Sequence, residues 1–264
     1  TLKLPKCQFG LPQVEYLGLG YVIGDGKILP NPKKIEAVRR YKQPVTKTDV
    51  KAFLGLAGYY RKFVPQYASI SAPLTELLKK GKPERVRWNA QCEEAFQKLK
   101  HKLSESPVLK VPDFSRAFVV QTDASEVGIG AVLTQTDENG HEHPVAFASR
   151  KLKPREQKYA VIEKECLAIV WALGFFHSYL YGQHFIVETD HQPLKWLQQM
   201  KNTNQRLTRW ALSLQPFKFD ICHRAGAQHK NADGLSRGPP DTSNLAIQRG
   251  EECDEVEPQG LAHA

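Results

Sequence analysis

Hydrophobic positions are spaced in different ways along the first half of this chain. Residues 1–30 hold β-forming residues interrupted by glycines, and the pair Asp25-Gly26 is typical of a hairpin turn. Over residues 31–112 the apolar positions recur at helical spacing, and helix starts are indicated at Pro32, at Thr46 or Thr48, and at Asn89. These patterns predict a β hairpin followed by a small, mostly helical domain.

Strand patterns become frequent from residue 113 onward. Runs of β-branched and aromatic residues predict five strands, at residues 118–123, 128–133, 143–150, 184–190 and 217–224. The predicted helices are a long one opened by Pro154, one that begins at Pro193, a basic one over residues 204–215, and a short terminal one that carries Asp233. This order predicts an α/β (α+β) fold with a mixed five-stranded sheet and flanking helices.

Two of the predicted strands end in an aspartate. Asp123 shares a pleat face with Gln121, and Asp190 shares one with Glu188. If the two strands are neighbours, both carboxylates emerge at the same edge of the sheet. A desolvated carboxylate needs a positive partner, so a metal ion or a basic group is expected there. For Asp123 alone, a role in capping the turn is the alternative.

A third acid lies on the apolar stripe of the long helix. Glu165 falls among residues predicted to face the core, whereas Glu163 points about 200° away from it. A structural salt bridge is one explanation for a buried acid. Another is a shared site, because several carboxylates from separate elements are the ligands that Mg²⁺ prefers, and without a cation they would repel one another.

The charge of the chain is concentrated in its first part. Residues 1–110 carry 21 basic and 9 acidic side chains, a net charge of +12, which favours a polyanionic partner over a merely solvated lysine-rich face. Tyr59, Tyr60, Arg61 and Lys62 form an aromatic and basic cluster of the kind that contacts nucleic-acid backbones. The end of an amphipathic helix is the alternative reading of this cluster.

Other features narrow the class of protein. The five cysteines are scattered and form no C-x-x-C pair, which indicates a reducing compartment and argues against a zinc site. We therefore expect an intracellular protein of the cytoplasm or nucleus. No apolar run approaches membrane-spanning length, so no membrane association is expected. Residues 238–264, with one basic and six acidic side chains, are expected to form a disordered acidic tail.

Several segments in order resemble one known family. TDASEVGIGAVLTQ, EKECLAIVWAL, YLYGQHFIVETDHQPLKWL and HRAGAQHKNADGLSR closely resemble the ribonuclease H domain of gypsy-class LTR-retrotransposon Pol polyproteins. FLGLAGYYRKFVPQYASISAPL and WNAQCEEAFQKLKHKLSESPVL resemble the thumb and connection of the same family's reverse transcriptase. The resemblance covers roughly residues 5–237. It implies a residual palm-like hairpin over residues 1–30, a thumb/connection-like segment over 31–112 and a ribonuclease H-like domain over 113–237.

The resemblance implies a role for particular residues. Four carboxylates match the family's catalytic and metal-binding acids: Asp123, Glu165, Asp190 and Asp233. His223 stands where ribonucleases H carry a mobile histidine, although it is equally consistent with a surface residue. The implied cofactor is a pair of Mg²⁺ ions, for which Mn²⁺ can substitute, and the implied reaction is hydrolysis of the RNA strand of an RNA–DNA hybrid. Predicted contacts to the nucleic acid are Tyr60, Arg61, Lys62, Arg206 and Arg209.

Three hypotheses about function remain open at this stage. The first is a metal-dependent ribonuclease H, part of a retrotransposon reverse transcriptase whose paired-aspartate polymerase motif does not occur in these 264 residues. The second is a non-catalytic retroelement-derived remnant that binds nucleic acid. The third is a structural subunit that serves a separate polymerase chain.

Overall fold

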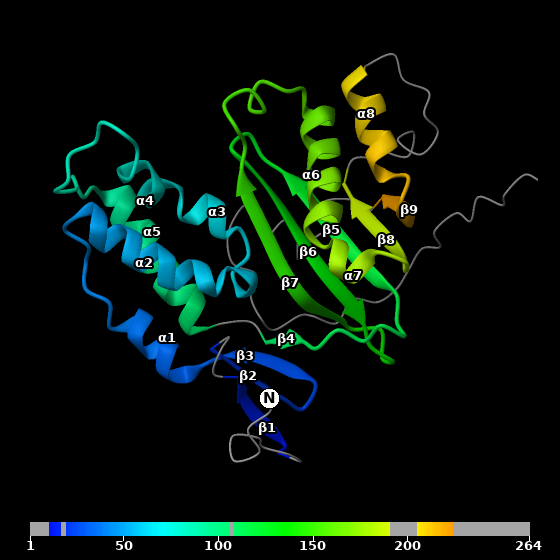
Figure 1. Ribbon diagram of the computed structural model, residues 1–264, viewed down its shortest axis with the longest axis horizontal. Helices are drawn as coiled ribbons and strands as arrows, with labels where there is room; N and C mark the ends of the chain where they lie inside the picture. Colours follow the sequence, from blue (N-terminus) through cyan, green and yellow to red (C-terminus); the bar gives the residue numbers. More distant parts are fainter. Residues whose placement is uncertain (1–10, 17–19, 106–107, 191–204, 224–264) are drawn as a thin grey trace, which may run out of the picture.

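The computed structural model describes residues 11–16, 20–105, 108–190 and 205–223 (Figure 1). The predicted helix from Pro193, the terminal helix with Asp233 and the acidic tail lie outside these residues. None of the helices within them combines the length and apolar character needed to cross a bilayer. The described residues form two β-sheets and two groups of helices.

A small antiparallel sheet lies at the N-terminal end. It contains β1 (Gln13–Tyr16), β2 (Tyr21–Gly24), β3 (Lys27–Pro30) and β4 (Leu109–Lys110), in that order across the sheet. Asp25 and Gly26 connect β2 to β3, and both have positive φ angles, of 50° and 68°. Because two such residues suit the twist of a two-residue hairpin, this predicted turn is confirmed.

Five short or medium helices follow the hairpin. They are α1 (Pro32–Arg39), α2 (Lys47–Tyr59), α3 (Tyr67–Ile70), α4 (Ala72–Leu77) and α5 (Ala90–Ser104), with a 3₁₀ turn, η2 (Arg61–Phe63), after α2. They enclose a core of buried apolar side chains that includes Phe53, Phe96 and Leu99. The predicted start at Asn89 is confirmed, because its side chain accepts a hydrogen bond from the backbone N–H of Cys92.

Thr46, and not Thr48, caps α2. Its hydroxyl oxygen accepts from the N–H of Asp49 at 3.1 Å, and the Asp49 carboxylate accepts from the N–H of Thr46 at 2.8 Å. Thr46→Ala is therefore expected to lower the free energy of unfolding by about 1 kcal/mol, or about 2–4 °C in Tm. Thr48→Ala is the matched control and should change Tm little. Thermal denaturation of both variants checks this, and equal losses would contradict it.

The larger sheet has five strands and mixed directions. They are β5 (Phe118–Ala124), β6 (Gly128–Thr136), β7 (Glu142–Lys151), β8 (His184–Thr189) and β9 (Lys218–His223), in the spatial order β7-β6-β5-β8-β9. β5, β6 and β7 are antiparallel, whereas β8 runs parallel to both β5 and β9. The predicted mixed five-stranded α/β fold is confirmed, and all five strands lie close to their expected positions.

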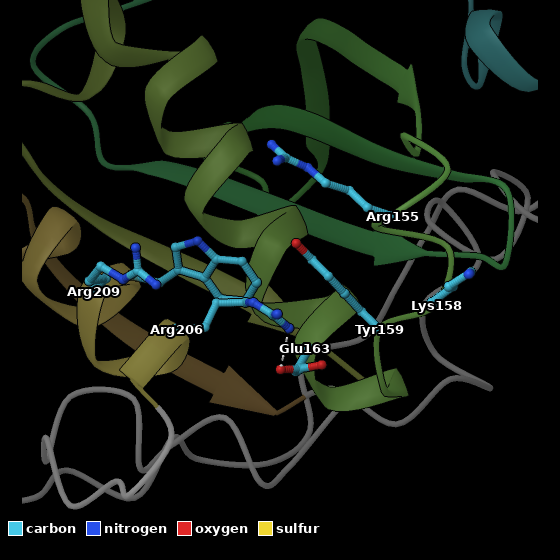
Figure 2. Close-up of a pocket in the computed structure, with 7 residues that line it drawn as sticks. Arg155, Lys158, Tyr159, Glu163, Arg206 and Arg209 are labelled. Atoms are coloured by element: carbon cyan, nitrogen blue, oxygen red, sulfur yellow. Dashed lines mark hydrogen bonds and ion pairs between the residues drawn. The ribbon is translucent and has the colours of Figure 1, made fainter.

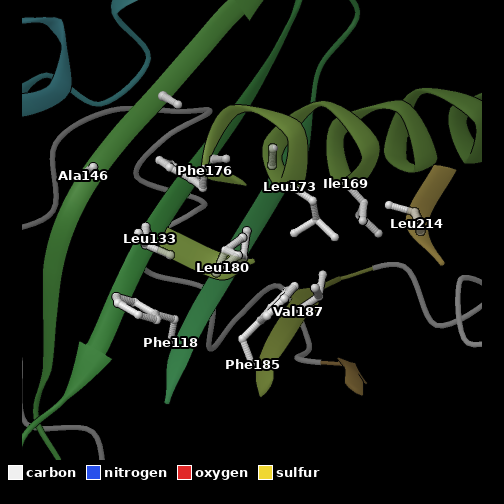
Figure 3. Close-up of a cluster of buried hydrophobic side chains, with 14 of the residues drawn as sticks. Phe118, Leu133, Ala146, Ile169, Leu173, Phe176, Leu180, Phe185, Val187 and Leu214 are labelled. Atoms are coloured by element: carbon white, nitrogen blue, oxygen red, sulfur yellow. The ribbon is translucent and has the colours of Figure 1, made fainter. Parts of the chain in front are cut away.

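Helices α6 (Val161–Phe175), α7 (His177–Leu180) and α8 (Gln205–Leu214) cover one face of this sheet (Figure 1). A cluster of buried apolar side chains fills the layer between them, with Phe118, Phe176 and Phe185 among its members (Figure 3). α8 confirms the basic helix predicted over residues 204–215.

The long helix does not begin at Pro154. Residues 154–158 form consecutive turns instead, and α6 starts at Val161. The carbonyl of Lys153 accepts from the N–H groups of Glu156 and Gln157, and the Glu163 carboxylate accepts from the N–H of Ala160. These bonds close a separate turn before the helix, so the prediction of a helix from Pro154 was wrong.

The other face of the sheet packs against the N-terminal helices at β6 and β7. Val132 and Phe147 belong to the same buried cluster as Phe53 and Phe96. Lys151 on β7 forms an ion pair with Glu76 of α4 at 3.1 Å. The two groups of helices therefore lie against opposite faces of one sheet, although the division of the chain into domains at residue 112 stays a prediction.

Candidate active site and the α6–α8 pocket

Asp123 and Asp190 lie at the same end of two adjacent strands. β5 and β8 are parallel, with Gln121 opposite Glu188, so the residues that follow emerge together at the carboxyl end of the sheet. Asp123 is half-buried on β5, and Asp190 is exposed directly after β8. The expected adjacency of the two aspartate-ending strands is confirmed.

Glu165 approaches this end of the sheet from α6. It is only 4% exposed, as its place on the apolar stripe predicted, and its carboxylate accepts a hydrogen bond from the backbone N–H of Ala124. Its Oε2 atom is buried without a hydrogen-bond donor. Burial raises the pKa of the Glu165 carboxyl to about 8, and the negative charges of Asp123 and Asp190 add to this shift. The three acids therefore interact within one site.

The chemistry of this acid set fits a hard divalent cation. The Glu165 carboxyl is buried with one oxygen that has no donor, and burial together with the charges of Asp123 and Asp190 opposes its ionisation, so a bound cation would favour its charged form. Within the described ranges, however, no three acidic, histidine or cysteine side chains lie close enough together to hold one ion. The fourth predicted ligand, Asp233, lies outside them. Metal binding by these residues therefore stays a prediction.

His223 lies beside the same strand end. It is the last residue of β9, opposite Thr189 of β8, and its side chain is exposed. Its Nε2 atom is 3.0 Å from the backbone carbonyl oxygen of Asp190, which a protonated Nε2 would donate to. The histidine thus contacts the backbone of a candidate ligand, and its proposed role in the reaction stays a prediction.

A cavity of about 650 Å³ opens between the 153–159 segment, the start of α6 and α8. Its lining, which we call the α6–α8 pocket, comprises Arg155, Lys158, Tyr159, Glu163, Arg206, Arg209 and Trp210 (Figure 2). Arg206 and Arg209 were predicted from the sequence as nucleic-acid contacts. Arg155 and Lys158 were missed, because they were assigned to a continuous helix.

Arg206 is held at two points in the α6–α8 pocket. Its Nη1 atom donates to Glu163 at 2.7 Å, and its guanidinium lies 4.1 Å from the centre of the Tyr159 ring (Figure 2). Four cationic side chains against one carboxylate leave the pocket with an excess of positive charge. An anionic group of suitable size, such as a phosphate, fits this charge and these donors.

The predicted contact cluster on the N-terminal helices needs correction. Tyr60 is 1% exposed and its hydroxyl donates to the carbonyl of Gly20 at 3.1 Å, so it is a core residue and the prediction that it binds nucleic acid was wrong. Lys62 is half-buried with its ammonium 3.8 Å from the centre of the Tyr21 ring, and burial lowers its pKa. Arg61 is exposed and stays a candidate contact.

Comparison with known proteins identifies the second part of the chain. Residues 113–217 match a family described as the RNase H-like domain found in reverse transcriptase. The chain is 44% identical over 239 residues to the retrovirus-related Pol polyprotein from transposon 297 of Drosophila melanogaster, and 39% identical over 243 residues to that from transposon gypsy. The chain is homologous to the Pol polyproteins of gypsy-type retrotransposons. The Tf2-3 polyprotein of Schizosaccharomyces pombe is 36% identical over 236 residues.

These Pol homologues are much longer than the chain. The alignments cover 89%, 88% and 88% of this chain but 22%, 23% and 17% of the transposon 297, gypsy and Tf2-3 polyproteins. The chain therefore spans about a fifth of the curated relatives that it matches.

Solved reverse transcriptases share the fold. The foamy viral protease–reverse transcriptase in complex with an RNA/DNA hybrid aligns with a TM-score of 0.69 at 19% identity, over 94% of this chain and 32% of that one. Its complex with double-stranded DNA aligns with a TM-score of 0.68 at 20% identity, over 82% and 45% of the two chains. The RNase H-like architecture of this Pol homologue is thus established.

Proposed function

We propose that the chain is a metal-dependent ribonuclease H that hydrolyses the RNA strand of RNA–DNA hybrids as part of a retrotransposon reverse transcriptase. The observation that carries this proposal is Glu165, whose buried oxygen without a donor lies in the same site as Asp123 and Asp190. Burying a carboxylate oxygen without a hydrogen-bond donor lowers the stability of the fold, so a purely structural role does not explain it. A cation bound at the site would offset this loss.

The carboxylates would act by position and charge. Asp123, Glu165 and Asp190, together with Asp233, would hold two Mg²⁺ or Mn²⁺ ions. Cations bound there supply stabilisation for the attacking and leaving oxygens of phosphodiester hydrolysis. Ala124 fixes one side of Glu165 through its N–H, and burial on α6 keeps that carboxylate from turning into solvent. His223, whose Nε2 atom lies 3.0 Å from the backbone carbonyl oxygen of Asp190, would act in proton movement or product release at the edge of the site.

The α6–α8 pocket would hold a backbone phosphate of the hybrid. The pocket and the acids share helix α6, because Glu163 lines the pocket and Glu165, two residues further on, belongs to the acid set. The foamy viral enzyme of the same fold was solved with an RNA/DNA hybrid, which supports this class of substrate. Recognition of RNA would come from 2′-OH contacts and from groove shape, since phosphate groups alone do not distinguish the two strands.

Arg209→Gln is expected to weaken hybrid binding about fivefold near 100 mM salt and to reduce the slope of log affinity against log salt by about 1, because one phosphate contact is lost. The matched control is Arg116→Gln, which removes a cation before β5, at the end of that strand opposite to Asp123. Fluorescence anisotropy with a labelled hybrid measures both. Equal effects of the two variants would show that only overall charge matters.

A gel assay with an end-labelled RNA–DNA hybrid tests the function. Cleavage of the RNA strand with Mg²⁺ or Mn²⁺, and none in EDTA or on double-stranded DNA, is expected. Tight binding without cleavage in either metal would refute the nuclease and support the non-catalytic, nucleic-acid-binding remnant.

A further inference from the structure

One buried ion pair shapes the loop between β7 and α6, which we call the 152–160 loop. Glu156 is 6% exposed, and its Oε2 atom accepts from Arg150 Nη1 and from the backbone N–H of Lys153, both at 2.7 Å. Its Oε1 atom is 3.4 Å from Arg150 Nη2. One carboxylate therefore joins the end of a strand to the backbone of the turn that follows it.

The residues around Glu156 in sequence line the α6–α8 pocket. Arg155, Lys158 and Tyr159 come from the 152–160 loop, and the N–H of Tyr159 donates to the carbonyl of Glu156 at 3.1 Å. Glu156 thus constrains the loop through both its side chain and its backbone. Tyr159 in turn supports Arg206 from across the pocket.

Arg150, the partner of Glu156, lies near the end of β7, which contacts structure on both faces of the sheet. It is opposite Ile129 in the β6–β7 ladder, and its guanidinium lies 5.8 Å from the centre of the Trp171 ring. The residues on either side of it are bound on the opposite face of the sheet. Ser149 accepts from the N–H of Ala68 at 3.0 Å, and Lys151 pairs with Glu76. The carboxylate of Glu156 is therefore paired with a strand residue whose two neighbours are bound to the N-terminal helices.

We propose that Glu156 is a positioning residue for nucleic-acid binding, which sets Arg155, Lys158 and Tyr159 in place in the α6–α8 pocket through its pair with Arg150. This inference rests on the proposed function, because the pocket is taken to hold a phosphate of the hybrid. A buried ion pair adds little net stability relative to apolar side chains of the same size. Its contacts within the loop that supplies the pocket residues point to a role in setting the conformation of that loop. Neither Arg150 nor Glu156 is among the groups that shift the pKa of Glu165.

Glu156→Gln tests this directly. The substitution keeps the size of the side chain and one acceptor but removes the charge that holds Arg150. We expect Kd and KM for a labelled RNA–DNA hybrid to rise about tenfold while kcat stays within twofold, because the ionic contacts of a misplaced loop are lost but the acids are untouched. Unchanged Kd and KM, or a fall in kcat as large as the rise in KM, would overturn the proposal.

Two further variants separate positioning from lost stability. Val145→Ala creates a small defect in the core on the same strand, β7, and should lower Tm while leaving Kd and KM unchanged. Arg150→Lys retains both charges of the pair but loses the second guanidinium contact. It should raise Kd by a smaller factor than Glu156→Gln does. If Glu156→Gln fails to fold, Arg150→Lys still tests the pair, because it is expected to fold. If Val145→Ala raised Kd as much as Glu156→Gln, a specific role for Glu156 would be excluded.

The wild-type protein distinguishes this proposal from the proposed function. Wild-type protein that binds the hybrid but does not cut it refutes the nuclease alone, and the change in Kd still decides the role of Glu156. Wild-type protein that does not bind the hybrid refutes both. Normal binding and cleavage by both the wild type and Glu156→Gln refutes the positioning role alone.

Discussion

Asp190→Asn is expected to lower the rate of hybrid cleavage by at least about 100-fold, because it removes one of the charges that would hold the cations and stabilise the transition state. The side chain is exposed at the end of β8, so the substitution alters no core packing. Tm should therefore stay within about 2 °C of the wild type. Single-turnover cleavage of a labelled hybrid in Mg²⁺, with Tm measured on the same preparation, provides the test.

Asp220→Asn is the matched control for this variant. Asp220 is exposed on the neighbouring strand, β9, and pairs with His184 at 3.2 Å, at the opposite end of β8 from Asp190. Its loss changes the net charge by the same amount without touching the proposed site, so cleavage should continue at the wild-type rate. Cleavage by Asp190→Asn at more than about half the wild-type rate would remove Asp190 from the proposed ligands.

The arrangement of the five-stranded sheet was largely predictable from the sequence. Runs of β-branched and aromatic residues bounded by turn residues indicate strands, so β5, β6 and β8 could be located from a few residues each. The stripe argument on α6 selected Glu165 over Glu163, and the structure agrees: Glu165 is buried and Glu163 pairs with Arg206. These features depend on local residue types and on helical periodicity, which a single sequence displays directly.

Features that depend on contacts between distant residues were not predictable. The 152–160 loop has residues suited to a helix, but it forms a turn in which Glu156 pairs with Arg150 of β7. Tyr60 belongs to a run of aromatic and basic residues that suggests an exposed surface. It is nevertheless buried, and its hydroxyl donates to the carbonyl of Gly20, directly before β2. In both cases tertiary packing overrides the local pattern, and the sequence alone does not indicate which segment packs there.

The same distinction explains why the α6–α8 pocket was only half predicted. Arg206 and Arg209 share a face of one helix, so their proximity follows from helical geometry. Arg155 and Lys158 reach the same cavity from a turn some 50 residues earlier in the chain, and only the fold brings them to it. A site assembled from two distant elements therefore requires the structure.

Glu165→Gln is expected to make the metal-free protein more stable at high pH. The folded-state pKa of Glu165, about 8, lies above its ordinary value of 4.5, so the native state binds this proton more tightly than the unfolded state does. The contribution of Glu165 to the free energy of unfolding is therefore fully present below pH 4.5 and is lost as the pH rises through 8. A glutamine stays neutral and avoids the loss, which amounts to about 2–5 kcal/mol above pH 8.

Thermal unfolding in EDTA at pH 5, 7 and 9 measures this effect. The variant should exceed the wild type by several degrees at pH 9 and by little at pH 5, whereas Glu94→Gln, a control exposed on α5, should follow the wild type throughout. Added Mg²⁺ should then raise the Tm of the wild type and not that of Glu165→Gln, since only the charged carboxylate gains a bound cation. A variant that is less stable than the wild type at pH 9 in EDTA would mean that the charge of Glu165 is compensated within the protein. The acids would then not form a site that needs a metal.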